Sequence, residues 1–158
     1  MPDSPRDADK PDILVFPPIL LGGAMLLGFV LDWLHPIPLL PPVAARILGV
    51  TLFVFSGALG YSAQTVLRRA GTNISPNQPT VALVTDGPYR RTRNPLYLAG
   101  LGVCLGVACF INGLAPFLLL APLWALLQWG IVRREERYLS AKFGEVYRAY
   151  RNQVPRWL

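Results

Sequence analysis

The chain has 158 residues, of which 53% are hydrophobic and only 15% are charged, and its formal net charge is +6. A soluble domain has about 25% charged residues, so this composition excludes an ordinary water-soluble fold. The basic residues gather in two segments, which favours contact with anionic lipid headgroups over binding to nucleic acid.

Three long segments carry no charge at all. Residues 13–31, 47–67 and 94–132 form uncharged runs of 19, 21 and 39 residues. A helix needs about 20 apolar residues to cross a bilayer, so the first two runs have the length of single spans. The third has twice that length, and the turn dipeptide Asn112-Gly113 interrupts it near the middle. We therefore expect an all-α integral membrane bundle of four transmembrane helices, the last two forming a tight hairpin. The expected spans are 13–34, 44–67, 95–111 and 114–132.

The remaining segments complete this domain plan. Residues 1–11 are polar and acidic and are expected to be disordered, whereas 12–158 should form a single membrane domain. The loop 68–94 is longer than the about 12–15 residues above which loops are usually functional or disordered, and its sequence favours a folded cytoplasmic segment. A cytoplasmic helix is expected over 133–151.

The distribution of Lys and Arg predicts the orientation in the membrane. Five arginines lie in 68–95 and seven basic residues follow Val132, whereas the connection 34–42 has none. The positive-inside rule therefore places both termini and the loop 68–94 in the cytoplasm. The short chain is typical of a bacterial protein, so we expect it in the bacterial inner membrane.

The C-terminal helix carries apolar residues at helical spacing. This stripe comprises Leu139, Phe143, Val146, Tyr147 and Tyr150. Glu135 lies four residues before Leu139 and therefore falls on the same face. Glu136 is one position round the helix. A carboxylate directed at a packed face is costly unless another group pairs with it, so the Glu135-Glu136 pair is a candidate functional feature.

The cysteines and the single histidine are interpreted as structural. Cys104 and Cys109 lie five residues apart in the third span, without the additional ligands that a metal site requires. His35 stands next to Pro36 in a connection and is interpreted as a loop residue. No metal site is predicted.

Two polar clusters are expected to meet at the cytoplasmic face of the membrane. One is the segment "GPYRRTRNPLY" (87–97) that leads into the third span, and the other is the glutamate pair that follows the fourth. A hairpin should bring these ends together. From composition alone, the favoured interpretation is that the arginines reach lipid headgroups and the glutamates neutralise them.

The order of these motifs favours a more specific interpretation. "GPYRRTRNPLYLAG" followed by "EERYLSAKFGEVYRAYRNQVPRWL" resembles the integral-membrane methyltransferases of the isoprenylcysteine carboxyl methyltransferase and phospholipid N-methyltransferase superfamily. The resemblance covers about residues 75–157, half of the chain, and it implies methyl transfer from S-adenosylmethionine to a lipophilic or membrane-embedded acceptor, either isoprenylcysteine-carboxylate-like or phospholipid-amine-like. The carboxyl-methylating branch usually has His at the position of Asn94. Asn at this position is closer to the phospholipid-methylating branch.

The resemblance also implies roles for particular residues. The cofactor-binding residues would be Val81, Ala82, Leu83, Val84, Gly87, Tyr89, Arg90, Asn94, Pro95, Leu96, Tyr97, Glu135 and Glu136. Arg93, Asn94 and Glu135 would position the reacting groups, with no covalent nucleophile. Either Arg90 or Arg93 could hold the cofactor carboxylate through two parallel hydrogen bonds. The family's substrate-contacting arginine falls near Ile131, so the adjacent Arg133 and Arg134 are the candidates for substrate binding.

Two other functions compete with this one. A sterol-reductase-like enzyme would have a similar C-terminal hairpin but bind NADPH, and such enzymes have additional spans. A non-enzymatic basic membrane scaffold would dock its arginines on anionic lipid, and lysine could then replace them with little effect.

Overall fold

The structure is a computed structural model that describes residues 13–74 and 78–158. The expected disorder of residues 1–11 lies outside this part of the chain. Helices form nearly all of the regular structure, and no strand is present in the described part. The elements are α1 (Pro17–Leu34), α2 (Pro42–Arg69), the short 3₁₀ helix η1 (Gly87–Arg90), α3 (Pro95–Ile111), α4 (Leu114–Leu127), the π-helical turn η2 (Gln128–Val132) and α5 (Arg133–Gln153). The predicted all-α class is therefore confirmed.

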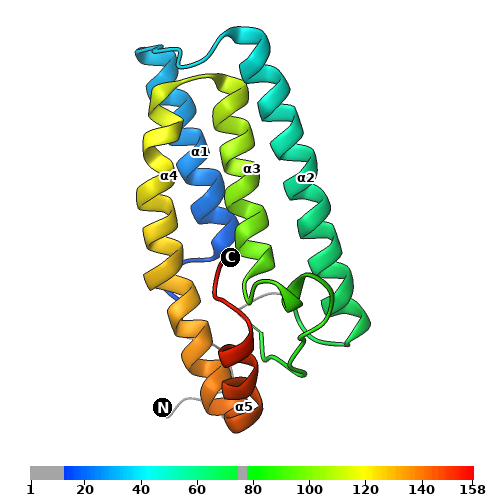
Figure 1. The fold of residues 1–158 in the computed structure, drawn as a ribbon. Coiled ribbons are helices and arrows are strands. Elements are labelled where there is room, and N and C mark those ends of the chain that lie inside the picture. Colours follow the sequence, from blue (N-terminus) through cyan, green and yellow to red (C-terminus); the bar gives the residue numbers. More distant parts are fainter. Residues whose placement is uncertain (1–12, 75–77) are drawn as a thin grey trace.

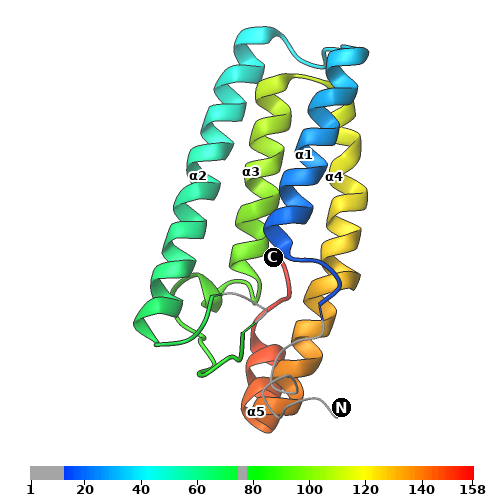
Figure 2. The ribbon, with the colours of Figure 1, turned by 180° about the vertical axis from the view of Figure 1, so that it is seen from behind.

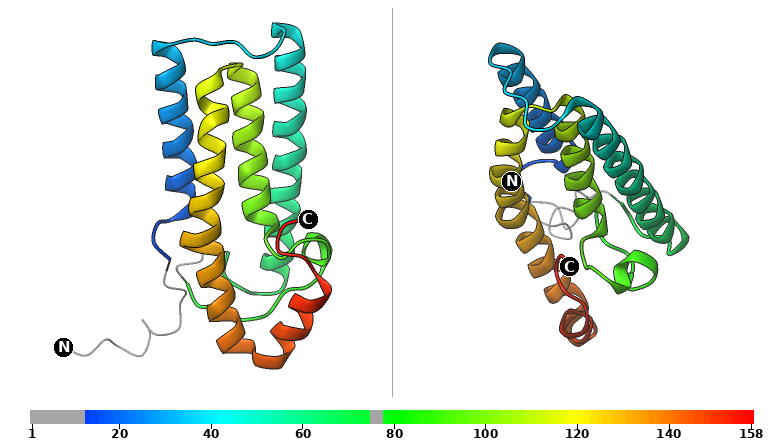
Figure 3. Two further views of the ribbon diagram at one scale, coloured as in Figure 1. Left: turned by 60° about the vertical axis from the view of Figure 1, so that its left-hand side comes forward. Right: turned by 45° about the horizontal axis from the view of Figure 1, so that its top comes forward.

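The helices α1, α2, α3 and α4 lie side by side in a bundle (Figure 1). α2 packs along α3, and α1 packs mainly on α4, so α1 and α2 lie on different sides of the bundle (Figure 2). The segment that connects α2 to α3 folds beneath the bundle at the end where α5 projects (Figure 3). We call this the loop end.

Three helices are long and apolar enough to cross a membrane. These are α1, α2 and the 40-residue run Leu114–Gln153, which comprises α4, η2 and α5. Only 11% of the residues in the apolar windows of α1 and α2 are buried, and large side chains such as Phe29, Ile47 and Phe55 are exposed. Such apolar surface is suited to contact with lipid. α3 is also apolar but has only 17 residues, so the fourth span stays a prediction.

The turn between α3 and α4 lies where the sequence predicts it. α3 ends at Ile111 and α4 begins at Leu114, with Asn112 in a left-handed conformation at φ 61°. The side chain of Asn112 accepts hydrogen bonds from the backbone N–H groups of Leu39 and Leu40, at 3.3 and 2.9 Å. This side chain therefore fixes both the α3–α4 turn and the connection between α1 and α2.

A close backbone contact joins α2 to α3. A Cβ atom added at Gly49 would lie 2.8 Å from the carbonyl oxygen of Gly106, and one added at Gly106 would lie 2.9 Å from that of Gly49. Small residues allow membrane helices to approach in this way. Gly49 and Gly106 therefore allow α2 and α3 to pack closely.

The expected helix over 133–151 is wrong in one respect. α5 extends from Arg133 to Gln153, but Gly144 interrupts its helical geometry with φ 55° and ψ −124°. The chain reverses there, and its second half returns towards the base of α3 (Figures 1 and 3). Because of this break, Val146 is 67% exposed and does not belong to the buried stripe, whereas Tyr147 and Tyr150 are buried.

Candidate functional site

A large cavity occupies the loop end of the bundle. Its volume is about 740 Å³, within the about 300–1,000 Å³ typical of small-molecule sites. Its walls come from the start of α1, the second half of α2, residues 72–74 and 80–84, η1, the start of α3 and α5. Elements that are distant in sequence therefore form one continuous site.

The two ends of the cavity differ in chemistry. The polar end is lined by Tyr89, Arg93, Asn94, Tyr97, Glu135, Glu136, Tyr147 and Tyr150. The other end extends between the helices and is lined by Phe16, Pro17, Leu21, Ser56, Gly57, Gly60, Ala99, Gly100 and Val103. We call the second region the apolar arm. The cavity can thus hold a polar molecule next to a lipophilic one.

Tyr97 and Glu135 connect the two helices of the hairpin. The Tyr97 hydroxyl donates a 2.8 Å hydrogen bond to Oε2 of Glu135. Burial raises the pKa of Glu135, the hydrogen bond from Tyr97 opposes this increase, and the nearby Glu136 carboxylate adds to it. The pKa of Glu135 is raised overall, so its environment favours the neutral acid more than water does.

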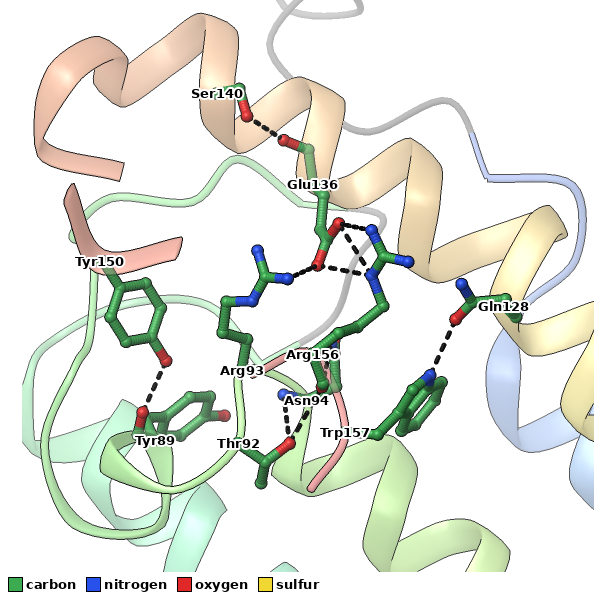
Figure 4. A network of polar contacts seen from close by, with 10 residues as sticks. All are labelled: Tyr89, Thr92, Arg93, Asn94, Gln128, Glu136, Ser140, Tyr150, Arg156 and Trp157. Atoms are coloured by element: carbon green, nitrogen blue, oxygen red, sulfur yellow. Dashed lines mark hydrogen bonds and ion pairs between the residues drawn. The ribbon is translucent and has the colours of Figure 1, made fainter. Parts of the chain in front are cut away.

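Glu136 is buried between two arginines (Figure 4). Arg93 approaches from one side, with Nη2 at 3.2 Å from Oε1. Arg156 approaches from the other side and donates three hydrogen bonds of 2.7 to 3.1 Å. Glu136 lines the cavity, as predicted for a cofactor-binding residue, but its carboxylate oxygens are already bonded to these arginines.

Arg93 is the buried cation of the polar end. Its side chain is only 8% exposed. Within the described residues, its Nε and Nη1 atoms are buried without a hydrogen-bond partner. Buried guanidinium N–H groups left without an acceptor are costly, so this arrangement is suited to an anionic group that enters the cavity.

Arg90 occupies a different environment from Arg93. It forms an exposed ion pair with Asp86 at 3.0 Å, and it does not line the cavity. The sequence did not decide which of these two arginines could bind a ligand. In the structure, only Arg93 of the two is in a position to contact a ligand in the cavity.

Besides Tyr97, three tyrosines line this end of the cavity. Tyr150 donates a 2.7 Å hydrogen bond to the backbone oxygen of Tyr89. Burial, with smaller contributions from Glu135 and Tyr150, raises the pKa of Tyr89 above its ordinary value. Burial and then Glu136 raise the pKa of Tyr147 to about 12, although Arg93 partly offsets this increase. Burial also raises the pKa of Tyr150, so all three phenols stay neutral near neutral pH.

Asn94 lines the cavity but also serves the local fold. It is the residue immediately before α3, and its Nδ2 donates a 2.9 Å hydrogen bond to the backbone oxygen of Arg156. Pro95 and Leu96, which follow it, also line the cavity. The Asn-Pro step thus starts α3 and attaches the C-terminal residues to it.

The segment 80–84 forms another wall. The side chain of Thr72 accepts hydrogen bonds from the backbone N–H groups of Val81 and Ala82, at 3.0 and 3.3 Å. Ala82, Leu83 and Val84 line the cavity, as the resemblance implies for cofactor contacts. Val81 is 66% exposed and does not line it.

Three further predicted residues lie outside the cavity lining. Gly87 starts η1 with φ 59° and shapes the turn that carries Tyr89. The exposed Arg133 guanidinium lies 5.7 Å from the centroid of the Trp129 ring, and Arg134 is not among the lining residues either. The placement of Arg133 and Arg134 therefore does not support their predicted contact with a substrate inside this cavity.

The sequence interpretation missed several lining residues. Tyr147 and Tyr150 were recognised as apolar stripe residues but not as part of a site. Thr72, Gln64 and Tyr61 also line the cavity, and no motif marks them. Arg156 contacts Glu136 from a segment beyond the last helix, where helical periodicity gives no information.

This cavity joins a polar end to an apolar arm in a protein that has helices long and apolar enough to cross a membrane. Residues 44–146 match the model of the phospholipid methyltransferase family, and this match covers more than half of the chain. The protein belongs to the phospholipid methyltransferase family. The predicted resemblance is thereby confirmed.

Two curated relatives are similar to part of the chain. The cobalt-zinc-cadmium resistance protein CzcN of Cupriavidus metallidurans is 34% identical over 104 residues, which is 66% of this chain and 48% of the relative. The nickel-cobalt-cadmium resistance protein NccN of Alcaligenes xylosoxydans xylosoxydans is 30% identical over 89 residues, which is 56% of this chain and 42% of the relative. The aligned parts thus span less than half of these relatives.

Proposed function

We propose that the protein transfers a methyl group from S-adenosylmethionine to a lipophilic acceptor held in the membrane. The observation that carries this proposal is the pairing of two groups in one cavity, namely the buried Arg93 with its unpartnered N–H groups and the Glu135 carboxyl. Membership of the phospholipid methyltransferase family supports the reaction class.

The polar end has groups that suit each part of this cofactor. The free N–H groups of Arg93 can donate to the methionyl carboxylate. Glu135 can accept hydrogen bonds from the ribose hydroxyls or the ammonium group. The rings of Tyr89 and Tyr97 can face the adenine or the sulfonium, and a cation–π contact is worth roughly 0.5–2 kcal/mol.

The residues of the site act by binding and alignment. When bound, S-adenosylmethionine would supply an electrophilic methyl group to the acceptor's N, O or S atom by in-line displacement, in which the methyl–sulfur bond breaks and S-adenosylhomocysteine is left. Arg93, Asn94 and Glu135 would fix the direction of attack, and this kind of positioning can account for much of a rate enhancement. The buried tyrosines would exclude water from the same end.

The apolar arm is suited to the acceptor. α1 packs mainly on α4 and α2 mainly on α3, and the arm is lined by residues from α1, α2 and the intervening α3. We propose that a lipid-like acceptor reaches the arm sideways from the bilayer. Its polar head would lie at the loop end, and its apolar chain would lie along Gly57 and Gly60.

The proposed orientation has four spans and places the loop end in the cytoplasm, where S-adenosylmethionine is made. The arginines of the loop and of α5 support this orientation through the positive-inside rule. Both termini would then be cytoplasmic, with the bacterial inner membrane as the host membrane.

The experiment uses the full chain purified in detergent. Methyl-labelled S-adenosylmethionine is incubated with the protein and a total bacterial lipid extract, and the label is then located by chromatography. We expect the label in a lipid fraction, and much less of it with Glu135→Gln. A thermal-shift comparison with NADPH provides a second measurement, and stabilisation by NADPH alone would reject the proposal in favour of a reductase. Absence of both label transfer and cofactor binding would favour the non-enzymatic scaffold.

A further inference from the structure

We propose that Arg156 is a positioning residue of the methyl-transfer site. It binds Glu136, so that the free N–H groups of Arg93 remain directed at the cofactor carboxylate. This inference rests on the proposed function. Arg156 lies ten residues beyond the part of the chain that matches the family model, which ends at residue 146.

The side chains of Arg93, Glu136 and Arg156 form a triad with two cations and one anion, and the first two are buried. The side chain of Arg93 is 8% exposed, that of Glu136 is 10% exposed, and that of Arg156 is 31% exposed. In Figure 4 the two guanidinium groups meet the carboxylate from opposite sides. The triad carries one excess positive charge, and its most deeply buried cation lines the cavity.

Arg156 makes most of the hydrogen bonds to this carboxylate. Its Nε lies 3.0 and 3.1 Å from the two oxygens of Glu136, and its Nη2 lies 2.7 Å from Oε2. Arg93 makes one longer contact of 3.2 Å. Hydrogen bonding to Glu136 raises the pKa of Arg156 further, so this guanidinium stays charged.

Because Arg156 makes most of the hydrogen bonds to Glu136, Arg93 can bind another anion. If Arg156 were absent, Glu136 would be a buried carboxylate with a single weak partner, which is a costly arrangement. The nearest cation is Arg93, whose planar guanidinium would turn to bind Glu136 through two hydrogen bonds. The donors that now have no partner would then be lost to the cavity.

The backbone holds Arg156 in place independently of its side chain. The N–H of Arg93 donates to the oxygen of Pro155 at 3.0 Å, and the hydroxyl of Thr92 donates to the oxygen of Arg156 at 3.0 Å. Nearby, the indole N–H of Trp157 donates to Oε1 of Gln128 at 2.9 Å. Replacement of the Arg156 side chain should therefore leave the C-terminal residues (154–158) attached, and it tests the charge contact alone.

The test measures binding of labelled S-adenosylmethionine to the full chain in detergent. The variants are Arg156→Gln, Arg156→Lys and the double variant Glu136→Gln/Arg156→Gln. The matched control is Arg148→Gln, because Arg148 belongs to an exposed ion pair with Glu145 on the same helix. Thermal unfolding of each variant shows that it is folded.

We expect Arg156→Gln to weaken binding by about tenfold, the difference made by one good charge-assisted contact. Arg156→Lys should lie between this variant and the parent because lysine keeps the charge without the fork. The double variant should bind within about threefold of the parent, since the neutral amide introduced by Glu136→Gln no longer captures Arg93 as an ion pair. If Arg156→Gln weakened binding only by loosening the C-terminal residues, Glu136→Gln would not restore it. Arg148→Gln should bind as the parent does.

Two results overturn the inference while the parent binds the cofactor. One is unchanged binding by Arg156→Gln, and the other is a double variant that binds no better than the single variant. If Arg156→Gln does not fold, the same comparison is made between Arg156→Lys and Glu136→Gln/Arg156→Lys, and equal affinities overturn the inference. A parent that binds no S-adenosylmethionine overturns the proposed function itself.

Discussion

The hydroxyl of Tyr97 donates a 2.8 Å hydrogen bond to Glu135, which joins the first turn of α3 to the first turn of α5. The two residues are 38 positions apart in sequence, and both line the cavity. The contact holds the Glu135 carboxyl next to the aromatic ring of Tyr97, which would face the ligand.

Replacement of the Glu135 carboxylate tests whether this residue binds the ligand. Glu135→Gln should weaken S-adenosylmethionine binding by about 10- to 100-fold, because hydrogen bonds to a charged group are worth about 1.5–3 kcal/mol. Tyr97→Phe should have a smaller effect, since it removes only the hydroxyl that orients Glu135. Calorimetry in detergent measures both. Equal affinities of the parent and Glu135→Gln would contradict the assignment.

The raised pKa of Glu135 predicts a pH dependence. In the unliganded protein, this carboxyl contributes stability while it is neutral, and that contribution is lost as the pH rises through its folded-state pKa, which lies above the ordinary value of 4.5. The proposed hydrogen bonds from the hydroxyl or ammonium groups of the ligand favour the ionised form, so its affinity should increase as the pH rises over the same window. Tyr89, which faces Glu135, stays neutral there because burial raises its pKa.

The pH prediction is checked by measuring the dissociation constant of S-adenosylmethionine upward from about pH 5, where an unperturbed glutamate would already be largely ionised. The affinity of Glu135→Gln should change much less than that of the parent across this window. A parent affinity that falls with rising pH over the same window would show that Glu135 does not bind the ligand as a carboxylate.

Arg90 and Arg93 provide a matched comparison. Arg93→Lys should weaken cofactor binding by at least about tenfold, because lysine cannot supply two parallel donors in a fixed plane. Arg90→Lys should leave binding unchanged, since Arg90 forms an exposed pair with Asp86. Both variants keep the charge, so attraction to anionic lipid is preserved. Equal tolerance of both changes would favour the membrane scaffold.

Much of this site follows from the sequence, and the reasons are local. The uncharged runs and the Asn112-Gly113 turn predict the hairpin, and the hairpin predicts that Tyr97 and Glu135 meet. The choice between Arg90 and Arg93 could not be made in this way, because both lie in a short turn whose direction depends on Gly87 and on packing against α2.

The errors at the C-terminus have a different cause. Helical spacing placed Val146 on the buried stripe, but the stripe ends where Gly144 reverses the chain. The contact between Arg156 and Glu136 spans 20 residues and depends on that reversal. A periodic pattern gives no information about a segment that is not helical, so this partner could be found only from the fold.

The orientation in the membrane can be tested with single cysteines. The native Cys104 and Cys109 are buried and should react poorly with a polar maleimide. Cysteine at the exposed Val81 should react only when the cytoplasmic side is accessible, whereas cysteine at the exposed Ile37 should react from the other side. Labelling of intact cells and of inverted vesicles distinguishes the two. Reaction of both positions from one side would contradict the predicted orientation.

The apolar arm predicts a variant that separates cofactor binding from methyl transfer. Gly57 lines the arm, and a Cβ atom added there would have no neighbouring side chain or other helix within 4 Å. We therefore expect Gly57→Leu to fold, with its side chain in the space assigned to the acceptor. We expect S-adenosylmethionine binding within about twofold of the parent but a loss of lipid methylation of at least about tenfold, because a filled pocket excludes the acceptor without touching the polar end.

The matched control for the blocked arm is Gly22→Leu. Gly22 is exposed on α1, a Cβ atom there also meets nothing within 4 Å, and the residue does not line the cavity. This variant adds the same apolar volume to a membrane helix and should methylate lipid as the parent does. Equal methylation by Gly57→Leu and Gly22→Leu would mean that the acceptor does not occupy the arm. If Gly57→Leu lost cofactor binding as strongly as methylation, the two ends of the cavity would not act as separate sites.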